Sequence, residues 1–377
     1  MKTTYIAELL FTGNEWLKHQ AITVEDGFIL SLDSSTNCKE TKLAGLLTAG
    51  FIDTQVNGGG GALFNHQPTE QTLKLMVKAH SQFGSTGLMP TLITSNIEDL
   101  HQAANAISDA ITQTTPGVLG VHFEGPHLSH DKKGIHSSEH IRGLSEQELE
   151  VYCRGDLGKK MLTVAPENVS IDDIKTLVAH NVIVCLGHSN ATYEQTQAAI
   201  NAGATGFTHL FNAMSSQTSR QPNMVGAALT NDQTWCGIIL DGHHVHPASA
   251  KSAYRCKPNG KLMLVTDSMS TIGSEQNMLE FDGHQISLYG DKLVSQTGQL
   301  AGSALDMISA VNNAQIMLSA SLSESLNMAS LYPAQFLNIE HQRGQLVEGA
   351  VADLTLLNTS CSQCNVLATW IAGDQIF

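Results

Sequence analysis

Residues 182–209, VIVCLGHSNATYEQTQAAINAGATGFTH, contain the pattern that decides the fold. A short apolar run at Val182–Leu186 precedes a segment of helical pattern at Thr192–Ala202, and a second short run follows at Thr205–Thr208. Short, apolar strands that alternate with helices are typical of a parallel sheet buried on both faces. A histidine follows each run, at His188 and His209. The segment therefore predicts a strand–helix–strand unit with a reactive side chain at each strand end.

The same alternation extends through the middle of the chain. We expect strands at eight apolar runs: Ala49–Gln55, Thr86–Ile93, Val118–Phe123, Met161–Ala165, Val182–Leu186, Thr205–Thr208, Cys236–Leu240 and Leu262–Thr266. We expect helices at Glu70–Phe83, Ile97–Thr112, after the capping box Ser145-x-x-Glu148, and at Ile171–His180, Thr192–Ala202, Ser303–Ser319 and Ser323–Leu337. Gly, Asn and Gln obscure the pattern after the sixth and seventh strands. Eight alternating strands fit a closed (β/α)8 barrel of the TIM type better than an open doubly wound α/β sheet.

The two ends of the chain have a different pattern, with short strands and turns. Glu25-Asp26-Gly27 is a hairpin turn between two apolar runs, and a Gly-Asp turn precedes the last residues. We therefore expect residues 1–48 and 343–377 to pair into one small sheet domain, and residues 49–342 to form the barrel.

The composition favours a large core and disfavours two classes of partner. Of the 377 residues, 42% are hydrophobic and 15% are charged, which argues against disorder. The 35 acidic and 20 basic residues give a net charge of −15. This charge disfavours nucleic acid and anionic membranes, which need a clustered basic face. The seven cysteines are scattered, and no signal peptide or membrane-spanning run is recognisable. We therefore expect a soluble, cytoplasmic protein.

Reactive side chains stand at the ends of five predicted strands: Glu124, His188, His209, Asp241 and Asp267. The carboxyl ends of barrel strands meet at one mouth, where barrel enzymes have their active sites. A single such residue is readily explained as a polar group on the rim. Five on five different strands indicate convergence on one site.

Two histidines and a glutamate from separate strands are a suitable ligand set for a divalent cation such as zinc. Glu124, His188 and His209 are therefore the predicted metal ligands. Such a metal acidifies water and polarises a carbonyl group, and a nearby carboxylate can carry the proton. Asp267 is the predicted general base and acid. Its alternative use is as the N-cap of a helix over Ser268–Ser270.

Five motifs occur in a characteristic order: Gly50-Phe51-Ile52-Asp53, His122-Phe123-Glu124-Gly125-Pro126, Gly187-His188-Ser189-Asn190-Ala191-Thr192, Thr208-His209-Leu210-Phe211-Asn212-Ala213-Met214 and Val265-Thr266-Asp267. Together they resemble the N-acetylglucosamine-6-phosphate deacetylase family of the amidohydrolase superfamily, over nearly the whole chain. The β-rich ends match the accessory β-sandwich domain of that family, so the resemblance implies such a domain for residues 1–48 and 343–377. The resemblance implies hydrolysis of N-acetylglucosamine 6-phosphate to glucosamine 6-phosphate and acetate, in amino-sugar catabolism and recycling.

Many amidohydrolases carry His-x-His at the end of the first strand and hold two metals. This chain has Gln55-Val56-Asn57 there, followed by a glycine run at 58–61 that we interpret as a loop and not as a phosphate loop. Neutral amides are poor replacements for imidazoles, so we predict one divalent ion per subunit, with Gln55 as a candidate contact to the metal or its water. Zinc is the expected ion, and iron, manganese or cobalt would also fit.

Substrate contacts follow from the resemblance, residue by residue. His136 corresponds to a histidine that contacts the acetamide carbonyl and helps to stabilise the oxyanion. Arg220 corresponds to a phosphate-binding arginine that reaches across a dimer interface, which implies a homodimer. The other implied substrate contacts are Ile135, Asn212, Ala213, Asp241, Gly242, His243, His244, Leu300, Ala301 and Gly302. The Lys132-Lys133 pair is interpreted as an exposed charged loop, with steering of an anion as the alternative.

Two other functions remain open at this point. One is an amidohydrolase that acts on a cyclic amide or a nucleobase, although such enzymes usually keep the His-x-His motif or a carboxylated lysine. The other is a non-catalytic barrel that serves as a scaffold. The presence of Glu124, His188, His209 and Asp267 argues against a scaffold, which has no need of all four.

Overall fold

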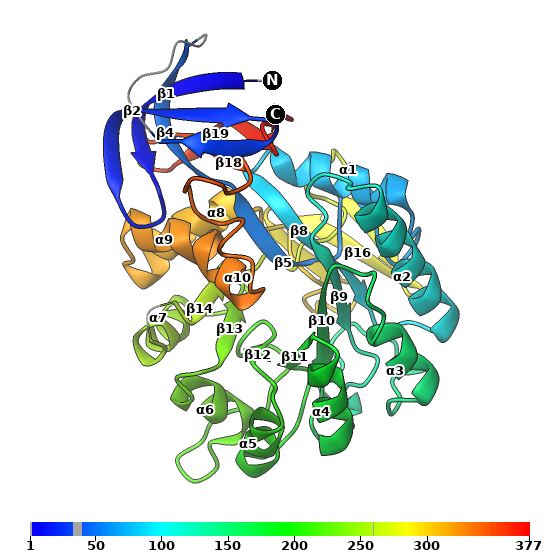
Figure 1. Ribbon diagram of the computed structural model, residues 1–377. Coiled ribbons are helices and arrows are strands. Elements are labelled where there is room, and N and C mark those ends of the chain that lie inside the picture. Colours follow the sequence, from blue (N-terminus) through cyan, green and yellow to red (C-terminus); the bar gives the residue numbers. More distant parts are fainter. Residues whose placement is uncertain (1, 33–39, 259) are drawn as a thin grey trace.

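A computed structural model describes residues 2–32, 40–258 and 260–377. Its centre is an eight-stranded sheet in the order β14-β13-β12-β11-β10-β9-β8-β5, in which all neighbours are parallel (Figure 1). The strands are β5 (Phe51–Val56), β8 (Ser85–Ile93), β9 (Gly120–Glu124), β10 (Lys159–Val164), β11 (Val182–Leu186), β12 (Gly206–Phe207), β13 (Trp235–Ile238) and β14 (Leu262–Leu264). The two edges meet beyond β14, where Val56 and Ser268 form a parallel bridge. The predicted barrel is therefore confirmed.

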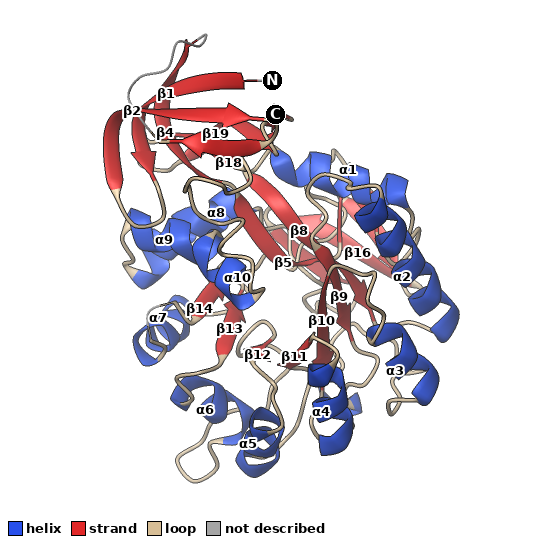
Figure 2. Ribbon diagram, in the orientation of Figure 1, coloured by secondary structure: helices blue, strands red, loops and turns tan. Residues whose placement is uncertain are grey.

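Helices form an outer ring around these strands (Figure 2). They are α1 (Glu70–Ser81), α2 (Ile97–Thr112), α3 (Glu146–Tyr152), α4 (Ile171–Ala179), α5 (Tyr193–Asn201), α6 (Asn223–Thr230), α7 (Pro247–Cys256), α8 (Met307–Asn313), α9 (Leu322–Ala329) and α10 (Leu331–Phe336). Two short helices, η1 (His130–Lys132) and η2 (Ala314–Leu318), lie in the loop after β9 and directly after α8. Side-chain caps fix several starts, and the predicted capping box of Ser145 and Glu148 is present. The helices that the sequence pattern left unassigned are α6 and α7. Within the described ranges, no helix combines the length and the apolar character needed to cross a bilayer.

Strands from both ends of the chain form a second sheet, in the order β20-β19-β18-β4-β1-β2-β3. They are β1 (Lys2–Phe11), β2 (Trp16–Glu25), β3 (Phe28–Ser31), β4 (Glu40–Ala49), β18 (Leu354–Asn358), β19 (Asn365–Ile371) and β20 (Asp374–Gln375). Asp26 and Gly27 make the predicted turn with φ values of 49° and 86°. Both termini lie at this sheet (Figure 1), which has its own hydrophobic core, separate from that of the barrel.

A small antiparallel sheet, absent from the sequence prediction, is inserted after β14. It consists of β15 (Met278–Phe281), β16 (His284–Tyr289) and β17 (Lys292–Ser295). Asp282 and Gly283, both at positive φ, connect Phe281 to its partner His284. An Asp-Gly pair between apolar residues is a hairpin pattern, so a sequence feature that could have revealed this insert was present.

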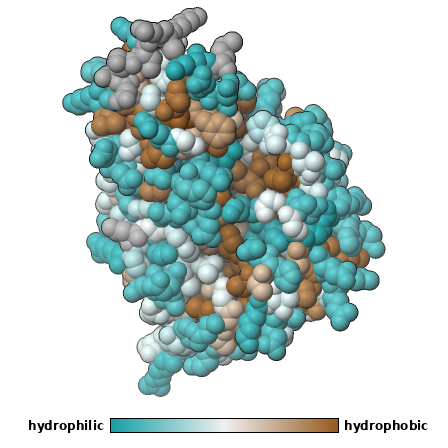
Figure 3. Space-filling view, viewed as in Figure 1, coloured by the Kyte–Doolittle hydropathy of each residue, from teal (hydrophilic) through white to brown (hydrophobic). Residues whose placement is uncertain are grey.

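The visible surface of the protein is mainly hydrophilic, as expected when most apolar side chains are buried in the core. Figure 3 shows one face on which hydrophilic residues predominate and hydrophobic ones form smaller groups between them. Six cysteines are free thiols in the described part of the chain, and Cys38 lies outside it.

Candidate active site

A cavity of about 400 Å³ lies at the carboxyl ends of the barrel strands. It collects most of the residues predicted to form the site: Glu124, Ile135, His136, His188, His209, Asn212, Ala213, His244, Asp267, Leu300 and Gly302. The other predicted residues do not line it in this chain: Gln55, Arg220, Asp241, Gly242, His243 and Ala301.

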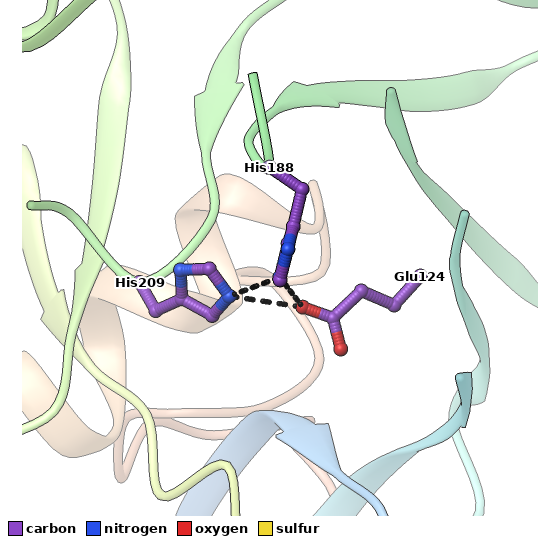
Figure 4. A group of neighbouring side chains, drawn as sticks. All are labelled: Glu124, His188 and His209. Atoms are coloured by element: carbon purple, nitrogen blue, oxygen red, sulfur yellow. Dashed lines mark hydrogen bonds and ion pairs between the residues drawn. The ribbon is translucent and has the colours of Figure 1, made fainter. Parts of the chain in front are cut away.

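Glu124, His188 and His209 come from the ends of β9, β11 and β12 and point toward one another (Figure 4). Oε1 of Glu124 lies 3.0 Å from Nε2 of His209 and 3.3 Å from Nε2 of His188. The two Nε2 atoms are 2.9 Å apart. Ligands at 2.0–2.2 Å from a tetrahedral ion would be separated by about 3.3–3.6 Å, so the observed cluster is close to the size of a metal site.

The hydrogen bonds around this cluster show that it suits a cation. Nδ1 of His188 lies 2.8 Å from the carbonyl oxygen of Lys132, which can only accept a hydrogen bond. In neutral His188, the proton is therefore on Nδ1, and the lone pair of Nε2 faces Glu124. A proton on Nε2 of His209 could satisfy only one of the two neighbouring acceptors. Three groups that can each offer an electron pair thus converge, and a divalent cation in place of the intervening protons would satisfy all of them.

Glu124 is held in the ionised form that a metal ligand needs. Burial acts to raise the pKa of its carboxyl group, but the hydrogen bonds and charges of His188 and His209 outweigh burial and keep the pKa well below its usual range. The side-chain amide of Gln55 also donates to Oε1 of Glu124, at 3.0 Å. Gln55 is nearly fully buried, and its amide group is directed at carboxylates.

Asp267 lies beside the cluster and is bound by the same pair of amides. Its Oδ1 accepts hydrogen bonds from Asn57 at 2.7 Å and from Gln55 at 3.2 Å. Burial, and then the negative charge of Glu124, raise the pKa of Asp267 to about 6. No helix begins in the residues that follow, 268–277, so the alternative reading as an N-cap is wrong.

Three of these residues occupy an unfavourable backbone conformation. His188, His209 and Asp267 have φ values of 47°, 31° and 53°. Such conformations cost about 1–3 kcal/mol each and persist where the surroundings impose them. Here, backbone amides of distant loops bind the carbonyl groups: Ser129 donates to His188 at 2.8 Å and Ser303 to Asp267 at 2.9 Å. The fold thus holds strained residues where the reactive side chains meet, as is common at active sites.

His136 reaches the cavity from the loop after η1. Its ring packs against that of His188, with centroids 4.3 Å apart, and its Nδ1 lies 2.8 Å from the hydroxyl of Thr94. Burial, followed by the proximity of His188, lowers the pKa of His136 well below its usual range. The ring is therefore neutral.

The loop after β13 carries four predicted substrate contacts, residues 241–244, and of these only His244 lines the cavity. Asp241 accepts from the backbone amides of His243 and His244 at 2.8 Å and binds Nδ1 of His244 at 2.5 Å. It thereby orients His244, which lines the cavity. His243 points to Asp291 in the insert, at 2.9 Å. Arg220 is exposed in a separate concavity beside Tyr193.

Several residues of the cavity wall were not predicted to lie there: Asn57, Ile93, Asp131, Lys132, Gly134 and Gln299. Asn57 belongs to the motif that replaces His-x-His, and its position after a strand could have identified it. Lys132 is half-buried and lies on the wall, although the sequence suggested an exposed loop. The glycine run is a tight buried hairpin, β6 (Gly58–Gly59) and β7 (Ala62–Leu63). A Cβ on Gly58 would lie 2.4 Å from the carbonyl oxygen of Ala62.

The fold and this site together define a class. A buried Glu-His-His cluster with an adjacent aspartate, at the carboxyl ends of barrel strands, is the arrangement of a metal-dependent hydrolase. Sequence comparison leads to the same class, because the profile of the amidohydrolase family matches residues 46–376. The chain belongs to the amidohydrolase family and is a metal-dependent hydrolytic enzyme.

Individual relatives in this family are similar to the chain over almost its full length. The chain is 49% identical to an N-acetylgalactosamine-6-phosphate deacetylase of Shewanella sp. (strain ANA-3), over 98% of this chain and 95% of the relative. It is 35% identical to an N-acetylglucosamine-6-phosphate deacetylase of Haemophilus influenzae, over 94% and 95%. The crystal structure of N-acetylglucosamine-6-phosphate deacetylase from Pasteurella multocida matches with a TM-score of 0.95 and 35% identity, over 100% and 99% of the two chains.

Proposed function

We propose that this enzyme hydrolyses the N-acetyl group of N-acetylglucosamine 6-phosphate, giving glucosamine 6-phosphate and acetate. One observation carries the proposal: Glu124, His188, His209 and Asp267 converge in one cavity. Relatives similar over almost their full length are deacetylases of amino-sugar phosphates. They do not favour a cyclic amide, a nucleobase or a scaffold role.

Each reactive residue has a defined task in this proposal. Glu124, His188 and His209 would hold one divalent ion, with zinc as the expected metal. When bound, that ion supplies Lewis-acid chemistry: it acidifies water and polarises the amide carbonyl. Asp267 takes a proton from the attacking water and returns it to the departing amine. His136 donates a hydrogen bond to the carbonyl oxygen as negative charge develops there.

The other residues of the cavity wall would contact and position the sugar phosphate, and a residue from the second subunit of a homodimer would complete the phosphate site. Asn212, Ala213 and His244 lie on the cavity wall, as do Leu300 and Gly302.

Among the described residues, Lys132 is the only lysine or arginine that lines the cavity. A phosphate dianion calls for more positive charge. Arg220 of a partner subunit would supply it with the forked donors that suit phosphate.

A second substrate deserves equal testing, because the relative with 49% identity is a deacetylase of N-acetylgalactosamine 6-phosphate. The two sugars differ only in the configuration of one hydroxyl group, so the same chemistry serves both. We also propose a cytoplasmic location, because the described cysteines are free, as in proteins of a reducing compartment.

The test is acetate release from both sugar phosphates, measured with the enzyme as purified, after chelation, and after addition of zinc, iron, manganese or cobalt. We expect release from at least one sugar, its loss on chelation and its recovery with one of the ions. Release that is unaffected by complete metal removal, or no release from either sugar by the metal-loaded enzyme, would overturn the proposal.

A further inference from the structure

Ile93 is an apolar side chain on the cavity wall, next to the proposed metal site. It is the last residue of β8, and it pairs with Glu124 in the parallel register of β8 and β9. It is only 2% exposed, yet it lines the cavity. Successive side chains of a strand point to opposite faces, so Leu92, the buried residue before it, points away from the cavity.

The backbone of Ile93 is held by a side chain from another part of the chain. The amide group of Asn65, which follows β7, accepts a hydrogen bond from the N–H of Ile93 at 3.0 Å and donates one to its carbonyl oxygen at 2.7 Å. Both backbone groups of Ile93 are thus bound by one amide. The end of β8 cannot move away from the cavity without losing these two hydrogen bonds.

A small hydrophobic cluster packs behind Ile93 and supports its side chain. Ile93 belongs to this cluster, and Ile135, the residue before His136, packs against it. Four members of the cluster come from the insert β15–β17: Leu279, Phe281, Ile286 and Leu293. The insert therefore backs an apolar side of the cavity, and Ile93 brings this side next to Glu124.

The acetamide group of the proposed substrate has three different substituents on its reacting carbon. Under the proposed function, the carbonyl oxygen faces the metal, and the nitrogen faces Asp267, which returns the proton to it. The third substituent, a methyl group, gains free energy from burial only against apolar surface. The side chains that contact the carboxylate of Glu124 are an amide and two imidazoles. Ile93, in register with Glu124, offers the apolar surface that the methyl group needs.

We propose that Ile93 determines the specificity for the acyl group: its side chain contacts the methyl group of the acetyl unit and excludes longer acyl chains. The inference rests on the proposed deacetylase function and deepens it. A longer chain would have to displace a side chain whose backbone is bound by Asn65 and which packs against the cluster of the insert. Extra carbon atoms in such a well-packed apolar site are unfavourable.

The test compares the N-acetyl and N-propionyl forms of the same sugar phosphate, by release of acetate and propionate from the metal-loaded enzyme. The measured quantity is the ratio of kcat/KM for the propionyl compound to kcat/KM for the acetyl compound. Loss of metal or of folded protein lowers both values equally and cancels from this ratio.

Two variants enlarge the site by different amounts. I93V removes one methylene group and keeps the β-branched shape that suits a strand, and I93A removes more. L92A is the matched control, because Leu92 is buried in the main hydrophobic core on the other face of the same strand.

One methylene group in an apolar pocket changes kcat/KM by about 10–200-fold. We expect the wild type to favour the acetyl compound by a factor in this range, and the ratio to rise by about tenfold in I93V and further in I93A. In L92A the ratio should stay at the wild-type value. Equal use of both compounds by the wild type, an unchanged ratio in I93V and I93A, or an equal rise in L92A would overturn the inference.

Failure of this inference and failure of the proposed function give different results. A metal-loaded wild-type enzyme that hydrolyses neither compound would overturn the proposed function, and the inference with it. Acetate release by the wild type, combined with an unchanged ratio in both Ile93 variants, would overturn the inference alone.

Discussion

Replacing Asp267 with Asn removes the proposed base and nearly preserves the shape of the site. Oδ1 of Asp267 accepts hydrogen bonds from Asn57 and Gln55, and the amide oxygen in the D267N variant can accept the same two. General acid–base catalysis contributes about 10²–10⁴-fold, so kcat should fall by that factor, or about 2.7–5.4 kcal/mol in activation free energy. The metal content should not change, because the three proposed ligands are intact.

The pH dependence provides a second readout of the same variant. Burial and the charge of Glu124 raise the pKa of Asp267 to about 6, and a base must be ionised to act. Activity should therefore be lost as the pH falls through the pKa, tenfold for each unit. A bound cation favours the carboxylate form, so this acidic limb should lie at or below pH 6 in the loaded enzyme. The limb should be absent from the residual activity of D267N.

The assay is acetate release at saturating substrate, combined with metal analysis. It should cover about pH 4.5–8, which includes the range in which the carboxyl group of Asp267 titrates. D131N is the matched control, because Asp131 also lines the cavity but makes no contact with Asn57 or Gln55 among the recorded hydrogen bonds. Its kcat should fall by less than about tenfold, since it takes no part in proton transfer. Turnover of D267N within tenfold of the wild type, or an unchanged acidic limb, would refute the role of Asp267.

Three further outcomes are expected. R220A should raise KM for the phosphorylated sugar far more than for the unphosphorylated one, in steady-state kinetics; equal effects would remove Arg220 from phosphate binding. K257M should lower the free energy of unfolding by about 2–4 kcal/mol without changing KM, because Lys257 is buried at the end of α7 and donates to the carbonyls of Ala228 and Asn231. K78M, at an exposed site, is the control in urea titrations. In the metal-free protein, burial raises the pKa of Asp53 to about 7. The folded state therefore binds the proton of this carboxyl group more tightly than the unfolded state does. The free energy of unfolding should fall as the pH rises from about 4 to 7, and it should fall less in D53N.

The barrel could be predicted because its determinants are local. Buried parallel strands are continuous apolar runs, and all eight runs correspond to observed strands to within a few residues. Helix starts were recognisable where a side chain caps the backbone, as at Ser145 and Thr192. The short α6 and α7 were not predicted, because Gly, Asn and Gln obscure the helical pattern after the sixth and seventh strands. The insert consists of strands of four to six residues, too short for a strong period.

From the strand pattern alone, the site could be predicted only where a strand fixes the direction of a side chain, whereas loop residues such as His136 and His244 were predicted from the family resemblance. Glu124, His188, His209 and Asp267 follow strands of one sheet, so their convergence is a property of the barrel. A loop has no such period. His243 and His244 are adjacent, but one contacts Asp291, 48 residues away in sequence, and the other lines the cavity. The position of the insert β15–β17 in the folded protein determines that His243 contacts Asp291, and the sequence around the two histidines does not reveal this position.

The amide pair at Gln55 and Asn57 explains in physical terms why one ion is expected where related enzymes hold two. Glu124 and Asp267 are neighbouring buried carboxylates, and burial, followed by their mutual repulsion, raises the pKa of Asp267. A second cation would relieve it, but it would need lone pairs directed at it. The side chains of Gln55 and Asn57 instead direct N–H groups at the two carboxylates. These hydrogens occupy the directions from which a second ion would be bound, and they provide part of its electrostatic effect without carrying its charge. Asp267 thus keeps a pKa high enough to take up a proton during turnover, which a second cation beside it would lower.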